Sequence, residues 1–331
     1  MKKILMLSTG GTIASVEGDN GLEPQIGAHA LISLVPELEG LCAIETKEVL
    51  NIDSSNIEPE NWSLLAKNVA AEYENYDGFV ITHGTDTMAY TASALTYMLP
   101  SLQKPLVLTG SQLPAETEGT DAKKNILDAF RTAISNIQGV CVTFAGKIIK
   151  GVCATKMHTQ NFNAFYSVNY PYIGEIIDNN VVINHETCAA KSEFICMPKI
   201  DKKVLQVKLL PGITGQIIDY ASTSGYKGLI IEGYGAGGIP DANEGFVAAI
   251  QRAISQGVIV VCTSQAIYDG VDLNKYTPGH TAIRIGAVSA GKMTAEAAAV
   301  KLMWALGNAA DSVGALELFN SDSVSYLEFI A

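Results

Sequence analysis

The sequence predicts an α/β protein with a larger N-terminal parallel-sheet domain and a smaller C-terminal α/β domain. Short apolar stretches typical of buried strands alternate with longer amphipathic stretches typical of helices from Lys3 to about residue 160. The alternation weakens over residues 161–203 and resumes at Val204. A chain of 331 residues is also longer than one ordinary domain. We therefore expect an N-terminal domain over residues 1–190, a linker over 191–205 and a C-terminal domain over 206–331.

The elements of the first domain follow from the spacing of its apolar residues. The clearest helix covers residues 59–76, where apolar side chains recur at helical spacing behind a proline that suits the first turn. The other expected helices cover residues 27–34, 87–99 and 121–138, the last with the carboxylate of Asp121 as its cap. The expected strands cover residues 3–7, 44–50, 78–82, 105–109, 140–145 and 151–155. Such alternation predicts a parallel sheet with helices on both faces.

Two further stretches complete the outline. Residues 16–28 are rich in Gly and Pro, which predicts a flexible loop of the kind that often serves as a lid. In the second domain we expect strands at 204–209, 228–231 and 258–262 and helices at 242–256 and 294–306. Apolar residues from Val313 to Phe319 predict a last short helix.

Composition excludes several function classes. The net charge of −12 argues against nucleic-acid binding, which needs clustered Lys and Arg. No apolar stretch approaches the length of about 18 residues that a transmembrane helix requires. The apolar stretch before Gly10 is about five residues long, shorter than the roughly 7–15 residues of a signal-peptide core. We therefore expect a cytoplasmic protein that binds no membrane.

Metal, cofactor and disulfide motifs are also missing. The six cysteines form no C-x-x-C pair, and most lie in apolar stretches as buried free thiols do. The five histidines lack a ligand spacing such as H-E-x-x-H, and His83 is expected only to pack beneath a turn. The stretch from Gly233 to Gly238 does not match G-x-G-x-x-G, and no G-x-S-x-G elbow is present. We expect no metal and no cofactor.

Two turns of similar design carry the functional signal. The first strand runs into Gly10-Gly11-Thr12, and the strand at 78–82 runs into Gly84-Thr85-Asp86. Glycines at such positions let the backbone turn tightly and approach a ligand closely. Polar residues follow four strands in all, and in an open α/β sheet the carboxyl ends of the strands form the ligand site. The four residues expected to share that crevice are Thr12, Ser54, Thr85 and Ser111.

Each of these hydroxyls has an ordinary alternative role. Ser and Thr at strand ends often cap the next helix, and this alone would account for Thr87. The pair formed by Thr12 and Thr85 is harder to explain in that way, because each follows a glycine turn. A threonine hydroxyl is a weak nucleophile, so it needs a partner that takes its proton.

Asp86 and Lys156 are the candidates for that support. Lys156 follows the apolar residues Val152 to Ala154, and a partly buried Lys beside Asp86 can accept a proton from Thr85 or from a water. The alternative is a structural ion pair, which is the commoner role of an Asp and a Lys. Backbone N–H groups of the first turn, that of Gly11 among them, are candidates for an oxyanion hole.

At these residues the chain resembles the bacterial L-asparaginases, and in particular their cytoplasmic type I branch. Thr9 to Ala14 matches the first signature of the family, and the run Gly78 to Thr87 matches the second. The likeness continues through Asp53-Ser54-Ser55, Thr109-Gly110-Ser111 and Thr155-Lys156. It covers essentially the whole chain in order.

The resemblance implies hydrolysis of L-asparagine to L-aspartate and ammonia through an acyl-enzyme, within asparagine catabolism and without metal or cofactor. It implies that Thr12 attacks the side-chain amide, and that Thr85, Asp86 and Lys156 form the second hydroxyl–carboxylate–amine group. The implied substrate-binding residues are Asp53, Ser54 and Ser55 toward the α-carboxylate, Asp86 toward the α-ammonium, and the carbonyl of Ser111 toward the amide nitrogen. A weaker activity on glutamine stays open. The implied assembly is a homodimer or a homotetramer.

Three positions depart from the family pattern. Leu22 stands where many relatives have a lid tyrosine that assists the first threonine, so the sequence leaves open what activates Thr12. Glu232 stands where some allosteric type I relatives carry an arginine, and we expect no activation by asparagine because a carboxylate repels the effector's own. Gly238 replaces an asparagine common near the partner's site, which is expected to loosen substrate selection.

Two other functions stay open. One is the amidase subunit that acts with glutaminyl-type tRNA, which is expected to carry an added RNA-binding region. The other is a non-catalytic amino-acid sensor, a function that the leucine at position 22 would fit.

Overall fold

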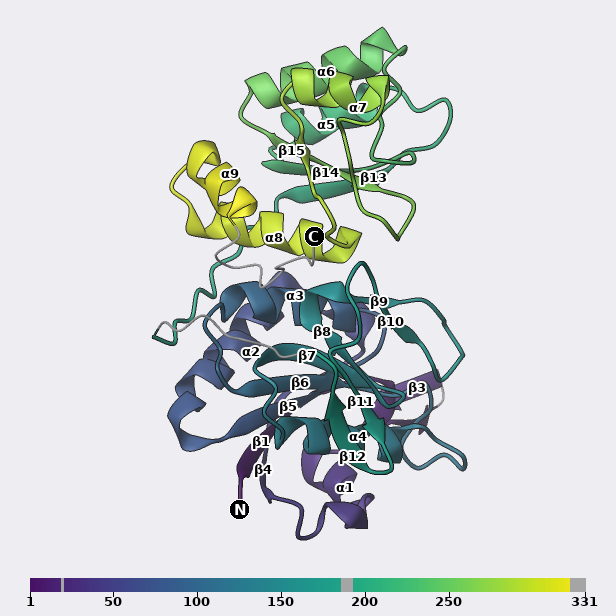
Figure 1. The fold of residues 1–331 in the computed structure, drawn as a ribbon, viewed down its shortest axis with the longest axis vertical. Helices are drawn as coiled ribbons and strands as arrows, with labels where there is room; N and C mark the ends of the chain where they lie inside the picture. Colours follow the sequence, from purple (N-terminus) through teal and green to yellow (C-terminus); the bar gives the residue numbers. More distant parts are fainter. Residues whose placement is uncertain (19–20, 186–192, 322–331) are drawn as a thin grey trace. The chain divides into compact units, whose positions relative to one another are not determined.

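The computed structural model describes residues 1–18, 21–185 and 193–321, which fold into two compact units that divide between Pro198 and Lys199 (Figure 1). Each unit is built on a sheet with a parallel core that helices cover, as the alternation of strands and helices predicts. The first unit holds every residue expected at the catalytic site.

The first unit is built on an eight-stranded sheet. Its parallel part has the order β4 (Ala43–Ile52), β1 (Lys3–Gly10), β5 (Gly78–Thr82), β6 (Pro105–Thr109) and β7 (Gly139–Phe144). Three antiparallel strands extend it beyond β7: β8 (Lys147–Lys150), β11 (Gly174–Ile177) and β12 (Asn180–Ile183). Because β4, β1, β5 and β6 are parallel neighbours, the loops that follow them leave from one edge of the sheet.

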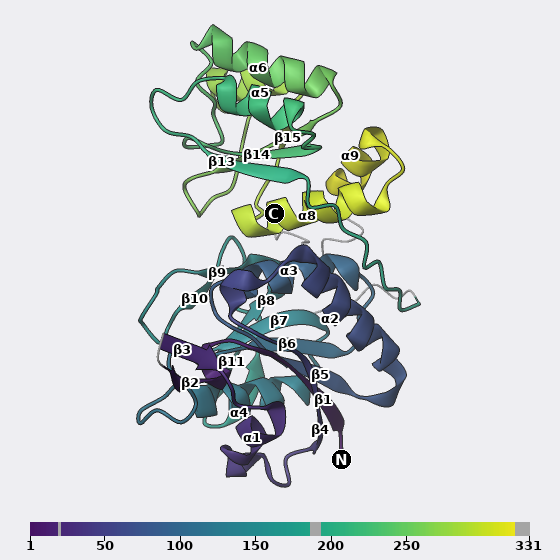
Figure 2. The same ribbon diagram turned by 180° about the vertical axis from the view of Figure 1, so that it is seen from behind.

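Helices cover both faces of this sheet. Helices α2 (Pro59–Ala71) and α3 (Met88–Met98) lie on one face, and α1 (Ala28–Ser33) and α4 (Ala122–Ala133) lie on the other (Figures 1 and 2). Ile4 and Met6 of β1 share a fully buried core with Ile126 and Phe130 of α4. Leu5 and Leu7 alternate to the opposite face, so β1 is apolar on both sides.

Short 3-10 turns occupy several of the connections. They cover η1 (Thr12–Ala14), η2 (Pro36–Leu38), η3 (Ser54–Asn56), η4 (Tyr73–Asn75) and η5 (Gly151–Cys153). The helix expected over 59–76 therefore ends at Ala71 and is followed by η4. The helix expected to reach residue 138 ends at Ala133, and the Ser135 hydroxyl donates to the Thr132 carbonyl at 2.7 Å just beyond it.

The second unit has a four-stranded parallel sheet. Its strands lie in the order β13 (Val204–Lys208), β14 (Gly228–Gly233), β15 (Ile259–Ser264) and β16 (Val288–Ser289). Its helices are α5 (Gln216–Thr223), α6 (Glu244–Ser255), α7 (Thr277–Arg284), α8 (Ala295–Asn308) and α9 (Ser312–Asn320). The short final helix is confirmed, whereas α5 and α7 were not expected. Pro278 and Gly279 obscure α7 in the sequence, although Pro in a first turn is compatible with a helix.

The prediction of a loop without strands over residues 16–28 was wrong. The structure has an antiparallel hairpin of β2 (Ser15–Gly18) and β3 (Gly21–Pro24), in which Leu22 is paired with Glu17. The hairpin is anchored at its base because the N–H groups of Gln25 and Ile26 both donate to the Ala14 carbonyl at 2.8 Å. Residues 19 and 20 lie outside the described residues.

The strand expected over 151–155 was also wrong in part. Residues 151–153 form η5, and β9 (Ala154–Lys156) pairs with β10 (Phe165–Ser167) in a separate two-stranded sheet. A Cβ at Gly151 would lie 2.8 Å from Thr96 Oγ1 and 3.1 Å from the Ala92 carbonyl, so the backbone there is pressed against α3. This close approach lies just before β9, where the chain leaves the main sheet.

The described part of the chain contains no helix that is long and apolar enough to cross a membrane. In the same residues, no group of three His, Cys, Asp or Glu side chains is arranged to hold a metal ion. Cys42, Cys141, Cys153, Cys196 and Cys262 are free thiols, while Cys188 lies outside the described residues.

Candidate active site

The glycine turns after β1 and β5 are in direct backbone contact. A Cβ at Gly11 would lie 2.3 Å from the Gly84 amide nitrogen and 2.4 Å from its Cα, and Gly11 has a φ of +77°. A Cβ at Gly84 would in turn lie 2.5 Å from the Ser54 hydroxyl oxygen in the loop after β4. Only glycine allows this approach, which brings together the loops that carry Thr12, Thr85 and Ser54.

The loop after β6 joins the same cluster. A Cβ at Gly110 would lie 2.3 Å from the His83 carbonyl, and the His83 N–H donates to the Thr109 carbonyl at 2.8 Å. Ser111 follows Gly110 directly and is buried. The structure thus brings the four predicted strand ends to one edge of the sheet.

Thr85, Asp86 and Lys156 form a hydrogen-bonded group. The Lys156 Nζ lies 2.7 Å from Thr85 Oγ1 and 2.6 Å from Asp86 Oδ1. The Lys156 side chain is 16% exposed and that of Asp86 is 63% exposed, while Thr85 is almost fully buried. The ion pair anticipated as the ordinary alternative is therefore present. It is coupled to a buried hydroxyl, which a purely structural surface ion pair does not require.

Helix α3 begins directly after this group. Thr85 and Asp86 precede Thr87, which occupies the N-cap position of α3. The N-terminus of a helix carries a partial positive charge, which favours negative charge that develops nearby. The hydroxyl of Thr87 does not act as the expected cap, however, because it donates to the Ser54 carbonyl at 2.8 Å. That bond ties the β5 loop to the β4 loop instead.

Thr12 is partly buried and is the first residue of η1. The N–H of Gly11 donates to the Ile52 carbonyl at 3.0 Å, and the Gly11 carbonyl accepts from the Ser15 hydroxyl at 2.9 Å. Both polar groups of Gly11 therefore hold the turn in place. The N–H of Gly11 is directed at β4, which corrects its assignment as an oxyanion-hole donor.

Asp53, Ser54 and Ser55 follow β4 as a capped 3-10 turn. The Asp53 carboxylate accepts from the Ser55 N–H at 2.8 Å and also from the Ser55 hydroxyl. Ser54 is buried, whereas Ser55 is exposed. The three residues lie next to the glycine contact, and the carboxylate of Asp53 already fixes the local backbone.

Asp121 anchors the loop after β6 and does not cap α4 with its side chain. Its carboxylate accepts from the N–H of Gln112 at 3.0 Å and from that of Leu113 at 3.2 Å. The Ser111 hydroxyl donates to the Leu113 carbonyl within the same turn. The cap expected at Asp121 was wrong because neighbouring N–H groups in the Ser111 loop compete for the same carboxylate.

Gln112 is a site residue that sequence reasoning missed. Its Oε1 accepts from the Thr85 hydroxyl at 3.4 Å, and its Nε2 donates to the carbonyls of Asn161 at 3.1 Å and His158 at 3.3 Å. It therefore links the β5 and β6 loops to the segment that follows Lys156. The available signal was its position directly after Ser111 at a strand end.

His83 is also more than a packing residue. Its ring is fully buried, and this burial lowers the pKa of the imidazole to about 4, against a hydrogen bond to the Gly84 carbonyl that favours protonation. The ring is therefore neutral near pH 7. The sequence signal for its partners is weak because Thr91 lies eight positions away and Trp62 lies on another helix.

The positions that depart from the family pattern lie as follows. Leu22 is 49% exposed on β3. Glu232 Oε1 accepts from Gln206 Nε2 at 2.7 Å on the neighbouring strand of the second unit. Gly238 lies in the turn after β14, where its carbonyl accepts from the Tyr234 N–H at 2.9 Å.

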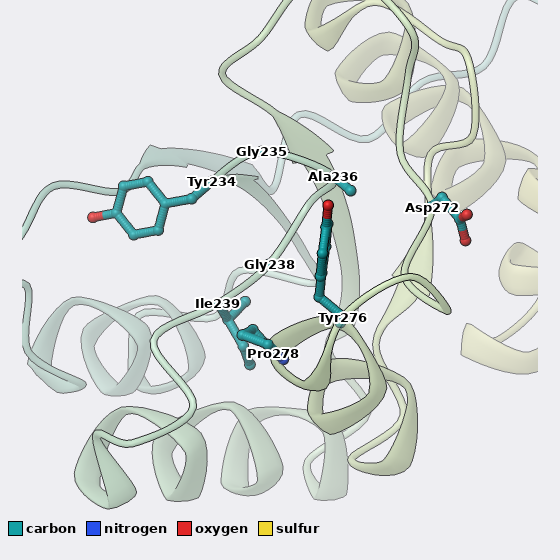
Figure 3. Close-up of a pocket in the computed structure, with 9 residues that line it drawn as sticks. Tyr234, Gly235, Ala236, Gly238, Ile239, Asp272, Tyr276 and Pro278 are labelled. Carbon is teal, nitrogen blue, oxygen red and sulfur yellow. The ribbon is translucent and has the colours of Figure 1, made fainter.

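A pocket of about 230 Å³ in the second unit is a separate feature. Figure 3 shows the Tyr276 ring extending toward Ala236, while the Tyr234 ring points away from it. The pocket is lined by one charged residue, Asp272, whose Oδ1 accepts a hydrogen bond from the nearby Asn274 N–H at 3.0 Å. The pocket contains none of the expected catalytic residues, so the catalytic candidate is the glycine-turn cluster of the first unit.

Comparison with known proteins agrees with this architecture. The chain matches the family described as Asparaginase, N-terminal, over residues 3–189, and the Glutaminase/Asparaginase C-terminal domain over residues 203–319. It is 39% identical over 310 residues to an L-asparaginase of Thermococcus kodakarensis, covering 93% of this chain and 94% of that protein.

It is also 36% identical to a glutamyl-tRNA(Gln) amidotransferase component of Pyrococcus abyssi, covering 93% of this chain and 73% of that protein. A solved structure of the thermostable L-asparaginase from Thermococcus kodakarensis superimposes with a TM-score of 0.92 at 37% identity, covering 97% of this chain and 98% of the other. The chain therefore belongs to the asparaginase family.

Proposed function

We propose that this protein is an L-asparagine amidohydrolase that releases L-aspartate and ammonia through a threonine acyl-enzyme, with a weaker activity on glutamine. The observation that carries the proposal is the group formed by Lys156, Thr85 and Asp86. Thr85 and Asp86 follow Gly84, whose backbone is in contact with Gly11, the residue before Thr12. Family membership and the L-asparaginase relative support the same substrate class.

In the proposed reaction, the Thr12 hydroxyl oxygen attacks the amide carbon. Thr85 accepts the proton, directly or through a water, and passes its own proton to the Lys156 amine. The proton returns from Lys156 through Thr85 to the leaving nitrogen as the C–N bond breaks, so that ammonia departs and the acyl group stays as an ester on Thr12. A water then attacks this ester and gives its proton to the same route, and the proton returns to the Thr12 oxygen as the ester bond breaks and aspartate is released.

The oxyanion of each tetrahedral intermediate needs fixed donors. Since the Gly11 N–H is engaged with Ile52, we assign the role within this turn to the N–H of Thr12. The adjacent N-terminus of α3 favours the same charge.

Substrate orientation is proposed to come from residues around the same loops. The exposed carboxylate of Asp86 is suited to the α-ammonium group, because only one of its oxygens is bound to Lys156. Ser55, with Ser54 and Asp53, is assigned to the α-carboxylate side, and the Ser111 carbonyl to the amide nitrogen. Two carboxylates repel each other, so the substrate carboxylate is assigned to the serine side of this turn and not to the Asp53 carboxylate, which accepts from the Ser55 N–H.

We further propose a cytoplasmic enzyme of the type I branch that assembles as a homodimer or homotetramer. The resemblance of the two signatures supports the branch and the assembly. The free thiols among the described residues suit a reducing compartment.

The second candidate is an amidase function of the kind named for the tRNA amidotransferase relatives, which is supported by the 36% identity to one of them. Ammonia release from asparagine and from glutamine distinguishes the two functions. A preference for asparagine supports the asparaginase, and a strong preference for glutamine supports the alternative.

The nucleophile is tested with Thr12→Ala, Thr12→Ser and the matched control Thr9→Val. Thr9 is buried at the end of the same strand, but its hydroxyl donates to the Thr82 carbonyl at 3.0 Å. We expect ammonia release to be lost in Thr12→Ala, partly retained in Thr12→Ser and near normal in Thr9→Val. Equal release by wild type and Thr12→Ala would contradict the assignment, and no release by wild type would favour a non-catalytic sensor.

A further inference from the structure

A buried chain of hydrogen bonds connects helix α2 to the β5 turn. The Trp62 indole N–H donates to Thr91 Oγ1 at 3.0 Å, and Thr91 Oγ1 lies 2.9 Å from His83 Nε2. The other ring nitrogen, His83 Nδ1, lies 2.7 Å from the Gly84 carbonyl oxygen. Thr91 and His83 are fully buried and Trp62 is 5% exposed, so the chain is shielded from solvent.

The donor and the acceptor of each hydrogen bond in this chain follow by elimination. An indole N–H can only donate, so the Thr91 oxygen accepts from it. A carbonyl can only accept, so His83 Nδ1 must carry a proton to bond to Gly84. A neutral imidazole then has no proton on Nε2, which accepts from the Thr91 hydroxyl. The chain therefore runs in one direction, from Trp62 through Thr91 and His83 to Gly84.

The end of the chain is the peptide group that joins Gly84 to Thr85. Since the C=O and N–H of a trans peptide point in opposite directions, holding the Gly84 carbonyl toward His83 fixes the orientation of the Thr85 N–H. This is also the glycine whose contacts with Gly11 and Ser54 exclude a side chain. Glycine restricts its own backbone dihedral angles least. A hydrogen bond from a residue outside the glycine therefore adds a restraint on the orientation of this peptide.

We propose that His83 is a positioning residue, held in a single tautomer by Thr91 and Trp62, which fixes the Gly84–Thr85 peptide and so the hydroxyl of Thr85 beside Lys156. The proposal rests on the proposed function in giving Thr85 a catalytic role. Packing alone would explain a buried ring. It would not explain two oriented hydrogen bonds that begin on another helix and end on the residue before Thr85.

The test uses Thr91, which touches none of the reacting groups. Thr91→Val keeps the shape of the side chain and removes the hydroxyl, whereas Thr91→Ser keeps the hydroxyl. The matched control is Thr96→Val in the same helix, because the buried Thr96 hydroxyl donates only to its own helix, at the Ala92 carbonyl 2.8 Å away. Melting temperatures confirm that each variant is folded.

We expect Thr91→Val to lower kcat by roughly 10–100-fold, because a displaced catalytic group is enough for losses of this size. KM for asparagine should change much less, and both Thr91→Ser and Thr96→Val should stay close to wild type. A folded Thr91→Val with wild-type kcat would overturn the proposal, as would an equal loss in Thr96→Val.

A second readout does not depend on activity. Nitrogen NMR of the imidazole should show His83 protonated at Nδ1 alone in wild type, and backbone shifts of Gly84 and Thr85 should move in Thr91→Val but not in Thr96→Val. An Nε2–H tautomer, or unmoved shifts, would overturn the proposal. If wild type released no ammonia, the proposed function would fail while these spectra still decided whether His83 holds the turn.

Discussion

The Nζ of Lys156 lies 2.7 Å from the hydroxyl of Thr85, although 71 positions separate the two residues in the chain. Thr85 follows a strand of the main sheet, whereas Lys156 ends a strand of the separate β9–β10 ribbon. The ribbon therefore brings an amine to a turn that the main sheet forms. This convergence is the basis for the assignment of proton transfer to Lys156.

Replacing this amine gives the first prediction. Lys156→Met keeps a long apolar side chain but cannot accept a proton, so we expect kcat to fall by roughly 100-fold or more. The control is Lys147→Met, which removes a lysine paired with Glu175 at 2.7 Å in the same unit. Ammonia release by the two variants is the measurement.

The same experiment distinguishes the ordinary alternative. If Lys156 only formed a structural ion pair with Asp86, Lys156→Met would behave like Lys147→Met. Both would lose at most about 1 kcal/mol of unfolding free energy and would keep their kcat.

The contact between the glycine turns gives the second prediction. Gly11→Ala should cost roughly 3–5 kcal/mol of unfolding free energy, because it combines a left-handed backbone with overpacking against Gly84. Gly119→Ala is the control, since Gly119 has nearly the same φ of +74° and no atom within 4 Å of the added Cβ. It should cost about 1–2 kcal/mol. Urea denaturation measures both, and equal costs would show that the close approach is unimportant.

The sequence was informative where local chemistry decides the structure. Apolar strands ending in glycine turns predicted that Thr12, Ser54, Thr85 and Ser111 would lie at one edge, because parallel strands present their carboxyl ends together. The spacing of residues could not predict which hydrogen-bonding groups would already be bound to other parts of the protein. The Gly11 N–H bonds to Ile52, and the Asp121 carboxylate bonds to the Ser111 loop.

Hydrogen-bond partners that are distant in the sequence could not be predicted from spacing either. Nothing near His83 in the sequence marks Trp62 as a partner, because the two residues meet only through Thr91 of α3. The hairpin at residues 15–24 was missed because glycines are typical of loops, yet here cross-strand pairing and the bonds to Ala14 decide the structure.

Leu22 gives the third prediction. The family resemblance implies a tyrosine at this position that assists the nucleophile, but here the Leu22 side chain is half-exposed on β3, across from Glu17. We expect Leu22→Tyr to change kcat by less than about threefold, because the proton route proposed through Thr85 and Lys156, which lie 2.7 Å apart, needs no phenol. Leu22→Phe controls for the added ring. A gain of about tenfold or more in Leu22→Tyr alone would show that the missing phenol limits the reaction.

Glu232 gives the fourth prediction. Its carboxylate is held by Gln206 at 2.7 Å, at a position where some type I relatives are expected to bind the effector's carboxylate through arginine. Like charges repel, so we expect asparagine saturation curves to be hyperbolic in wild type and in Glu232→Gln. A clearly sigmoidal curve for wild type would contradict this.

The buried imidazole of His83 gives the fifth prediction. Burial lowers its pKa from 6.5 to about 4 in the folded protein, so between these values the unfolded chain binds a proton that the folded protein does not. The stability that the neutral ring contributes is therefore complete above pH 6.5 and is lost as the pH falls toward 4. The loss amounts to about 3 kcal/mol, from about 1.4 kcal/mol per pKa unit.

His83→Asn tests this prediction because asparagine does not titrate, while its amide can still donate toward the Gly84 carbonyl. The variant is expected to be less stable than wild type at pH 7, since it leaves the Thr91 hydroxyl without its acceptor and part of the site unfilled. The difference should shrink by about 3 kcal/mol between pH 7 and pH 4, because only wild type loses the contribution of the neutral ring. Urea denaturation of both proteins across this range measures the two slopes, and parallel slopes would mean that His83 titrates normally in the folded protein.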